Sequence, residues 1–213
     1  MPMKYLYDPP EIIKKLFNLF QWNTINNKVL ITFDDGPIPQ ATPKILSFLN
    51  QNKINALFFL VGNNIKKNPG LCNEIISEGH VIGNHTFNHI RLTRLKEEEI
   101  WSEISEVNYL LKEKYDYDIK YFRPPHGRFN KTVVNQINKA NLKPVMWSLL
   151  TRDYKNDLNL VKFGVSKYLW SNSVIVLHDS LKSENVIIDS LKFILEKVYE
   201  YNFQLGEASE CLR

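Results

Sequence analysis

His85 and His89, two histidines separated by three residues, are the clearest candidate metal ligands in the sequence. On a helical turn the two imidazoles would lie on one face with their Cβ atoms about 5–6 Å apart, close enough to share one ion. The motif is short, and a pair of solvated loop histidines has the same spacing. The metal interpretation therefore needs a carboxylate from elsewhere in the chain.

Asp34 and Asp35 directly follow the apolar run 29–33 and offer that carboxylate. Adjacent residues at the end of an extended strand point in different directions, so one carboxylate can reach a metal while the other faces a substrate. The sequence Asp-Asp-Gly-Pro is also typical of a plain turn, and this alternative stays open. Two histidines and one carboxylate leave free coordination positions, which suits zinc hydrolysis and also non-haem iron chemistry.

Arg123 and His178 are the other residues that could serve such a site. Arg123 precedes two prolines that stiffen the chain. It is either an ordinary surface charge or the partner of a carboxylate, which a charge-assisted hydrogen bond would keep ionised. His178 follows the apolar run 174–177. It is either a core histidine with satisfied hydrogen bonds or a second proton-transfer group whose pKa is set by a nearby aspartate.

The elements that must position these residues alternate along the chain. Apolar runs without polar alternation, as in strands buried on both faces, predict strands at 29–33, 56–61, 80–82, 120–122, 143–147, 173–177 and 202–205. Helical patterns lie between them at 41–51, 70–79, 96–114, 130–140, 157–170 and 184–200. This alternation predicts an α/β fold with a parallel sheet. The number of units favours an irregular seven-stranded (β/α) barrel over an open doubly wound sheet, which has the same alternation.

Charged and metal-capable residues gather just after the predicted strands. They occupy the segments 34–36, 85–89, 123–127, 147–153 and 178–179. In a parallel α/β barrel the carboxyl ends of the strands share one face, and that face carries the active site. We therefore expect these five segments to form a single active site at the C-terminal ends of the strands.

The chain of 213 residues has the length of one domain and contains no linker, repeat or low-complexity segment. We expect a single domain over 1–213, with a helical extension at 1–27 and a catalytic barrel at 28–205. Apolar residues at positions 12, 13, 16, 17, 19 and 20, after Pro9 and Pro10, predict a short amphipathic helix. Such a helix would cap a barrel end or lie on a membrane surface.

Charge and composition restrict the partners and the compartment. The net charge of +4 comes from scattered basic residues, which argues against a nucleic-acid partner because that would need clustering on one face. No apolar run approaches the length of a transmembrane helix. The first residues lack the pattern of a secretory signal, and Cys72 and Cys211 have no partner at ligand spacing. We expect a cytoplasmic protein with free thiols that acts as a monomer.

Five motifs, taken together, resemble those of polysaccharide deacetylases, which form carbohydrate esterase family four. In chain order they are Thr32-Phe33-Asp34-Asp35-Gly36-Pro37, His85-Thr86-Phe87-Asn88-His89, Arg123-Pro124-Pro125-His126-Gly127, Trp147 to Asp153-Tyr154, and Leu177-His178-Asp179. Each motif is weak alone, but all five in this order, each after a predicted strand, are specific. The similarity extends from about residue 28 to residue 205.

The resemblance implies a metal-dependent hydrolase that removes acetyl groups, chiefly N-acetyl groups, from a glycan such as peptidoglycan, a chitin-type glycan or acetylxylan. Asp35, His85 and His89 would bind the metal, with Zn²⁺ expected and Co²⁺, Ni²⁺ or Mn²⁺ as alternatives. Asp34 would be the general base that activates water. His178 would be the general acid that protonates the leaving group.

The resemblance also implies supporting roles. Arg123 would orient Asp34 and keep it ionised, and Asp153 would pair with His178 and raise its pKa. Leu177 would line the pocket for the acetyl methyl group. The remaining residues expected to contact the glycan or to hold the developing oxyanion through a backbone N–H are Pro125, His126, Gly127 and Trp147.

Three positions depart from the family pattern. The third motif usually carries an aromatic residue where this chain has His126, which adds a fourth imidazole close to the expected metal face, so a ligand role stays open. The fourth motif often has an acidic or amide residue where Leu150 stands, and a tryptophan in place of Tyr154. None of these changes removes a catalytic group, but they leave the glycan undetermined.

Three rival functions fit some of the residues. A phosphoesterase with two metals would need a second ligand cluster, and the sequence offers none. A sugar-binding module would not need a base, an arginine and an acid together. A non-haem iron oxygenase shares the two histidines and the carboxylate, but such sites usually lie on antiparallel β-barrels, which the alternation of elements does not predict.

Overall fold

A sheet of parallel strands forms the centre of the computed structural model, which describes residues 7–212. The first six residues of the expected N-terminal extension and the last residue of the chain lie outside this range. Seven strands follow the spatial order β5-β4-β3-β2-β1-β7-β6 and are all parallel, and β8 pairs in parallel with the start of β1. The strands are β1 (Lys28–Asp34), β2 (Leu57–Leu60), β3 (Val81–Asn84), β4 (Tyr121–Phe122), β5 (Lys143–Pro144), β6 (Leu149–Leu150), β7 (Val174–His178) and β8 (Gln204–Leu205). The expected α/β class and the parallel barrel-like sheet are confirmed.

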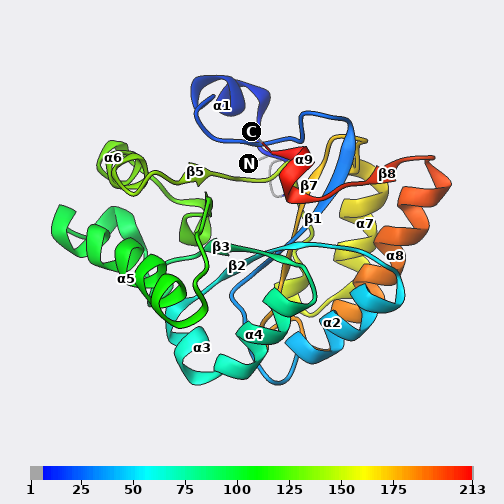
Figure 1. The fold of residues 1–213 in the computed structure, drawn as a ribbon. Helices are drawn as coiled ribbons and strands as arrows, with labels where there is room; N and C mark the ends of the chain where they lie inside the picture. The colour runs from blue at the N-terminus through cyan, green and yellow to red at the C-terminus, as the bar shows by residue number, and fades with distance from the viewer. Residues whose placement is uncertain (1–6, 213) are drawn as a thin grey trace.

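Helices surround the outer side of the sheet, with α2 to α4, α5 to α6 and α7 to α8 as successive groups (Figure 1). The six helices expected between the strands are present, and two short helices, α3 and α9, are additional. A helix of one or two turns shows too little apolar periodicity to be predicted from sequence. The helices are α1 (Glu11–Leu16), α2 (Thr42–Gln51), α3 (Gly62–Lys67), α4 (Pro69–Ser77), α5 (Glu97–Tyr115), α6 (Lys131–Lys139), α7 (Leu158–Tyr168), α8 (Ile187–Glu200) and α9 (Ala208–Cys211).

The side chains of β1 alternate between two apolar clusters, one on each face of the sheet. Ile31 and Phe33 are buried in the large cluster that contains the helices, whereas Leu30 belongs to the cluster inside the curved sheet. Because strand side chains alternate with period two, Thr32 and Asp34 lie on the same inner face as Leu30. The inner face of β1 thus runs from the apolar Leu30 to the carboxylate of Asp34 at the C-terminal end of the strand.

Strand β7 alternates in the same way. Ile175 and Leu177 pack in the outer cluster, and Val174 packs in the inner one. Val176 and His178 therefore share the inner face with Val174. Since β1 and β7 are neighbours, with Asp34 the register partner of His178, two chemically active side chains meet at the ends of adjacent strands.

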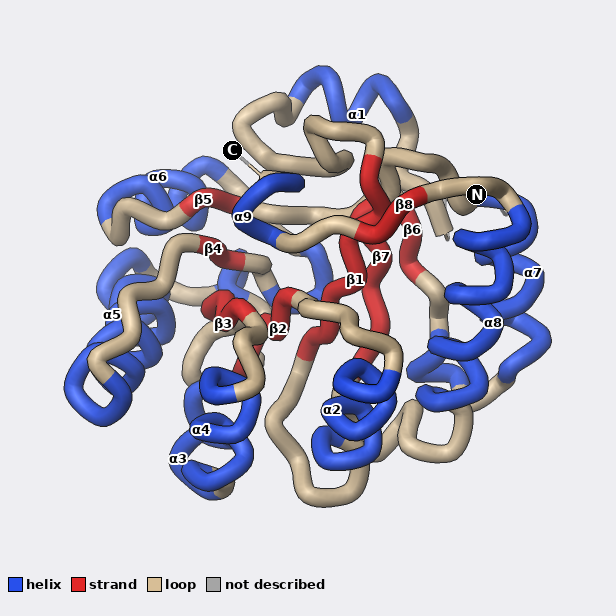
Figure 2. Tube along the Cα trace, turned by 45° about the vertical axis from the view of Figure 1, so that its right-hand side comes forward, coloured by secondary structure: helices blue, strands red, loops and turns tan. Residues whose placement is uncertain are grey.

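The barrel is open between its edge strands β5 and β6, because no pairing joins them in the described range 7–212. Figure 2 shows these two strands on opposite sides of the sheet. The expected strand at 143–147 is shorter than predicted, and β6 lies within residues 148–153, where no strand was predicted. That prediction was wrong because two residues make no sequence pattern, and β6 exists through its pairing with Ile175 and Val176 of β7.

Residues 20–24 of the N-terminal extension fill part of this opening. The backbone N–H of Met146 donates to the carbonyl of Gln21 at 2.8 Å, and the N–H of Thr24 donates to the carbonyl of Asn172 at 2.9 Å. Phe20 and Trp22 are buried against Met146. The expected short helix is present as α1, and the segment that follows it makes these contacts with the barrel. In the range 7–212, none of the helices has the length and apolar character needed to cross a membrane.

Replacing Trp22 by alanine tests whether the extension is part of the folded domain. Trp22 is only 6% exposed, and its indole N–H donates to the carbonyl of Phe17 at 3.0 Å. Truncating a buried tryptophan leaves a cavity, so Trp22→Ala should lower the free energy of unfolding by about 3–5 kcal/mol. Trp170 is 59% exposed, and Trp170→Ala should change it by less than about 0.5 kcal/mol. Equal urea midpoints for the two variants would contradict this account.

Candidate active site

A cavity of about 350 Å³ opens at the carboxyl ends of the strands, where the sequence motifs were expected to meet. Its size lies at the lower end of the roughly 300–1,000 Å³ that is usual for small-molecule sites. The residues that line it are Asp34, Asp35, His85, His89, His126, Gly127, Trp147, Leu150, Tyr154, Val176, His178 and Lys182. Residues from each of the five segments expected to form the active site therefore line one cavity, as predicted.

Asp34 and Arg123 form a buried ion pair at the inner wall of the cavity. The guanidinium Nη1 donates to Asp34 Oδ1 at 2.6 Å, and the side chains of Arg123 and Asp34 are 0% and 6% exposed. Burial by itself would raise the pKa of Asp34, but the charge of Arg123, with smaller effects of His85 and His178, holds it below its ordinary value. Asp34 is therefore an ionised carboxylate at neutral pH, as a general base must be.

Arg123 can stay charged inside the barrel because its guanidinium is surrounded by acceptors. Nε donates to the carbonyl of Val145 at 3.2 Å and Nη2 to the carbonyl of Met146 at 2.8 Å. Nη1 also donates to the Thr32 hydroxyl at 2.7 Å. The ring of Phe59 lies 4.1 Å from the guanidinium carbon. The sequence singled out neither Thr32 nor Phe59 as a partner, although a hydroxyl on the inner face of β1 was a detectable signal.

Asp35, His85 and His89 bring one ligand atom each within 4.8 Å of one another. Asp35 Oδ1 lies 3.1 Å from His89 Nε2 and 3.8 Å from His85 Nε2. His85 Nδ1 lies 2.7 Å from the carbonyl oxygen of Arg123, so Nδ1 carries the hydrogen and Nε2 keeps its lone pair. Burial lowers the pKa of His85 to about 4, and the neutral ring is the form that binds metals. The three residues thus fit a divalent metal ion.

The loop that carries the two histidines is not the helical turn that their spacing suggested. Residues 85–91 have no helical assignment, and Thr86 and His89 have positive φ angles of 66° and 55°. The imidazoles nevertheless meet, with ring centroids 5.0 Å apart. The loop is held by α5, where the buried Glu103 carboxylate accepts the backbone N–H of Asn88 at 2.8 Å. Tertiary hydrogen bonds, and not local helix geometry, bring the two ligands together.

Asp35 lies in a tight turn, and its carboxylate and that of Asp34 each lie 3.8 Å from His85 Nε2. Its φ of 81° is unusual for a residue with a side chain, so the surroundings must hold it. The side chain of Asn64 donates to the Asp35 carbonyl at 2.7 Å. At the next position, a Cβ on Gly36 would lie 2.1 Å from the Asp179 carboxylate, so only glycine fits. Both motif residues Gly36 and Asp179 therefore shape the turn of a metal ligand.

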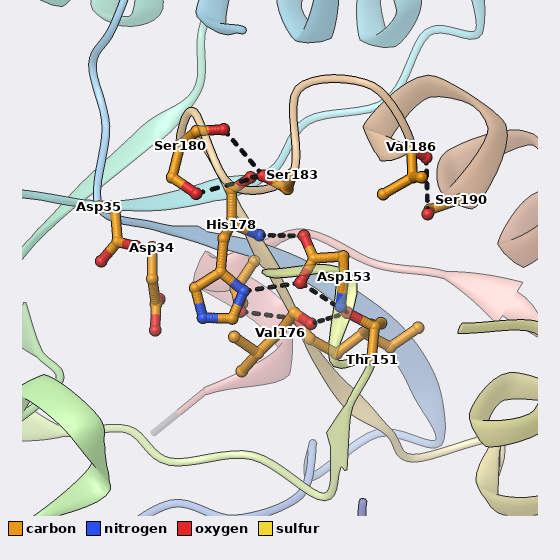
Figure 3. Close-up of polar contacts among 12 residues, drawn as sticks. Asp34, Asp35, Thr151, Asp153, Val176, His178, Ser180, Ser183, Val186 and Ser190 are labelled. Carbon is orange, nitrogen blue, oxygen red and sulfur yellow. Dashed lines mark hydrogen bonds and ion pairs between the residues drawn. The ribbon is translucent and has the colours of Figure 1, made fainter. Parts of the chain in front are cut away.

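His178 and Asp153 form the second charged pair of the site (Figure 3). His178 Nδ1 lies 2.7 Å from Asp153 Oδ1, and the backbone N–H of His178 donates to the other carboxylate oxygen at 2.6 Å. Burial by itself would lower the pKa of His178, but the charge and hydrogen bond of Asp153 raise it to about 9. The Thr151 hydroxyl donates to the same carboxylate at 3.1 Å. His178 is therefore protonated at neutral pH, as the predicted general acid requires.

The residues expected to contact the glycan divide into two groups. His126, Gly127 and Trp147 line the cavity, and a Cβ on Gly127 would lie 2.4 Å from the Trp147 indole. Pro125 and Leu177 do not line it, because Pro125 is buried and Leu177 packs in the outer cluster. The expectation for these two residues is corrected.

Val176 lines the cavity in place of Leu177. Side chains two positions apart on a strand share a face, so counting back from His178 identifies Val176 and not Leu177. Two other lining residues, Tyr154 and Lys182, had no expected role, and the Tyr154 ring meets the His178 ring with centroids 5.0 Å apart. His126 touches His89 at a centroid distance of 4.7 Å but lies outside the group of convergent ligand atoms.

Comparison with known proteins agrees with this geometry. The family model described as polysaccharide deacetylase matches residues 22–145, which is more than half of the chain. The chain belongs to the polysaccharide deacetylase family. The resemblance of the five motifs to carbohydrate esterase family four is thereby confirmed, and so is the expected class of enzyme.

Relatives of this polysaccharide deacetylase cover between 72% and 97% of its length. A peptidoglycan-N-acetylglucosamine deacetylase of Bacillus cereus is 33% identical over 197 residues, which are 90% of this chain and 92% of that protein. A chitooligosaccharide deacetylase of Azorhizobium caulinodans is 34% identical over 156 residues, or 72% and 74% of the two chains. The crystal structure of a peptidoglycan N-acetylglucosamine deacetylase with a bound N-oxidanyl-benzamide has a TM-score of 0.82 and 29% identity, and covers 97% of this chain and 94% of that one.

Substitution of Arg123 tests its effect on the carboxylate of Asp34, the expected base of this polysaccharide deacetylase. Without the guanidinium, burial raises the pKa of Asp34, so Arg123→Gln should need a higher pH than the wild type before the carboxylate ionises. The acidic limb of kcat/KM should therefore move to higher pH, measured as acetate release from chitooligosaccharide. Arg123→Lys keeps a charge and should move the limb less. If Arg123→Gln is folded by circular dichroism and its limb is unmoved, Arg123 does not control Asp34.

Substitution of Asp153 tests His178, the expected general acid, through the alkaline limb of the pH dependence of kcat/KM. The pKa of His178, about 9 in the wild type, should fall in Asp153→Asn because burial then acts without the compensating carboxylate. Since the acid works only while protonated, activity should be lost at a lower pH than in the wild type. The pH dependence of kcat/KM measures this shift. An alkaline limb that stays in place would show that another group is the acid.

Proposed function

We propose that this polysaccharide deacetylase removes the N-acetyl group of an amino sugar in a glycan of the peptidoglycan or chitin type, with zinc as its metal. The observation that carries the proposal is the placement of Asp34 and His178, register partners at the ends of neighbouring strands. Arg123 keeps the first ionised, and Asp153 keeps the second protonated. A base and an acid thus stand side by side in the cavity that contains the metal-binding triad.

Each catalytic residue then has one task in the hydrolysis. Asp34 accepts a proton from the water molecule whose oxygen forms a bond to the acetyl carbonyl carbon. The backbone N–H of His126, which has no hydrogen-bond acceptor within residues 7–212, is available to the carbonyl oxygen as it gains negative charge. His178 donates its proton to the amide nitrogen as the C–N bond breaks. The products are acetate and a free amino sugar.

Asp35, His85 and His89 would hold the divalent cation in this scheme. When bound, the cation supplies a Lewis acid that polarises the acetyl carbonyl and favours ionisation of water. Two imidazole nitrogens and one carboxylate oxygen with free positions are a typical catalytic zinc set, which supports zinc over harder cations such as Mg²⁺.

An amide is favoured over an acetyl ester because of His178. An amine is a poor leaving group until its nitrogen gains a proton, so amide cleavage depends on an acid that is protonated at working pH. The pKa of His178, about 9, meets this requirement. The relatives named for peptidoglycan and for chitooligosaccharides support an N-acetylated amino-sugar substrate.

Removal of the metal and substitution of Asp34 test the role of the metal and the role of the base separately. Chelator treatment should abolish acetate release from chitooligosaccharides and peptidoglycan fragments, and added Zn²⁺ should restore it. Asp34→Asn should bind as much zinc as the wild type but lose at least about a hundredfold in kcat, the usual contribution of a general base. Zinc content by atomic emission and turnover by an acetate assay measure the two effects.

Asp118→Asn is the matched control, because this aspartate is on the surface with 78% of its side chain exposed. It should keep both zinc and turnover. Full activity of metal-free protein would exclude the metal mechanism, and wild-type turnover in Asp34→Asn would exclude Asp34 as the base. Acetylxylan, tested in parallel, should release less acetate than the N-acetylated glycans.

A further inference from the structure

Two cations beside His126 at the mouth of the active-site cavity have no task in the proposed hydrolysis. Lys182 lines the cavity in the loop after β7, and Arg91 follows the metal ligand His89 by two residues. Both lie near His126: partial burial and the charge of His89 lower the pKa of this imidazole, the charge of Asp35 opposes this shift, and the charges of Arg91 and Lys182 add to it. The loops after β3, β4 and β7 therefore bring N–H-bearing side chains to the neighbourhood of His126.

Neither cation is neutralised by the protein. Within residues 7–212, the side chains of Arg91 and Lys182 form no hydrogen bond or ion pair, and both residues are exposed. The two carboxylates of the cavity are already engaged, Asp34 by Arg123 and Asp35 by the metal-ligand histidines. The charge of Asp35 also acts on His126, but no ion pair within residues 7–212 holds either cation, so both are available to a ligand.

The curvature of the sheet makes this arrangement. His126 follows β4 and Lys182 follows β7, and these strands are separated by β3, β2 and β1 in the sheet order. Their loops approach each other only because the sheet curls, so Lys182 and His126 line the same cavity. A glycan whose acetyl group enters the cavity must carry its other substituents past them.

We propose that Arg91, Lys182 and His126 form a subsite for an anionic group, a carboxylate or a phosphate, on the glycan beside the acetylated amino sugar. The inference rests on the proposed deacetylation, since it places the same substrate in the same cavity. Arginine binds such oxyanions through paired N–H donors and lysine binds them as a compact charge. The enzyme should therefore prefer an acidic glycan, such as one with muramic-acid carboxylates or sugar phosphates, to neutral chitin oligomers.

Three oligosaccharides of equal length separate the sources of the anion. They are a neutral chitooligosaccharide, a peptide-free peptidoglycan oligosaccharide that carries carboxylates, and a phosphorylated chitooligosaccharide. The wild type should show a lower KM for at least one charged substrate than for the neutral one. The charged substrate with the lower KM shows whether the subsite binds a carboxylate or a phosphate. Lys182→Gln and Arg91→Gln should each raise the KM for that substrate about fivefold more than for the neutral one, with kcat unchanged. Added salt should have the same selective effect on the wild type.

Lys120→Gln is the matched control, because this exposed lysine precedes β4 at the opposite end of the strands. It should leave all three KM values unchanged. Equal KM values for neutral and charged substrates in the wild type, or equal changes for all substrates in the two variants, would overturn the subsite.

Calorimetric binding to Asp34→Asn protein keeps this test independent of turnover. The charged oligosaccharide should bind more tightly than the neutral one, and adding Lys182→Gln should remove the difference. Selective binding without acetate release from the wild type would refute the proposed function but retain the subsite. Acetate release with no selectivity in binding would refute the subsite but retain the proposed function.

Discussion

The buried ion pair of Arg123 and Asp34 is the interaction on which the rest of the site depends. A charge in a protein interior is tolerated only when it is paired and hydrogen-bonded, and removing one partner of such a pair typically costs about 3–5 kcal/mol. Here every side of the guanidinium has a partner: the Asp34 carboxylate, the Thr32 hydroxyl, two backbone carbonyls and the Phe59 ring. Asp34, the proposed base, is thus also an anchor that joins β1 to the segment after β4 and to the segment after β5.

The cavity holds a second pair with the opposite effect on protonation. Arg123 keeps a carboxylate ionised, whereas Asp153 keeps the imidazole of His178 protonated. Asp34 is buried and His178 is half-buried against the buried Asp153, so water screens each charge less than it would at the surface. Two titratable groups whose surroundings push their pKa values in opposite directions are what acid–base hydrolysis needs, and the register of β1 and β7 sets them next to each other.

Some predictions from sequence failed where structure depends on distant contacts or on the face of a strand. The spacing of His85 and His89 suggested a helical turn, but a loop held by Glu103 of α5 brings them together. Leu177 was expected in the acetyl pocket, although the alternation from His178 already favoured Val176. The short strand β6 and the charged mouth around Lys182 leave no pattern that one segment could reveal.

The sequence by itself indicated most of the strands and helices in their order, the candidate metal ligands and the charged residues at strand ends, because residue type and strand periodicity are local properties. It also indicated the pairing of Arg123 with Asp34 and of Asp153 with His178 through the family resemblance. Only the tertiary structure decided which side chains share the cavity, because that depends on how far the sheet curls and on which face each strand presents. The same curvature leaves the barrel open between β5 and β6 and brings the loop after β7 over His126.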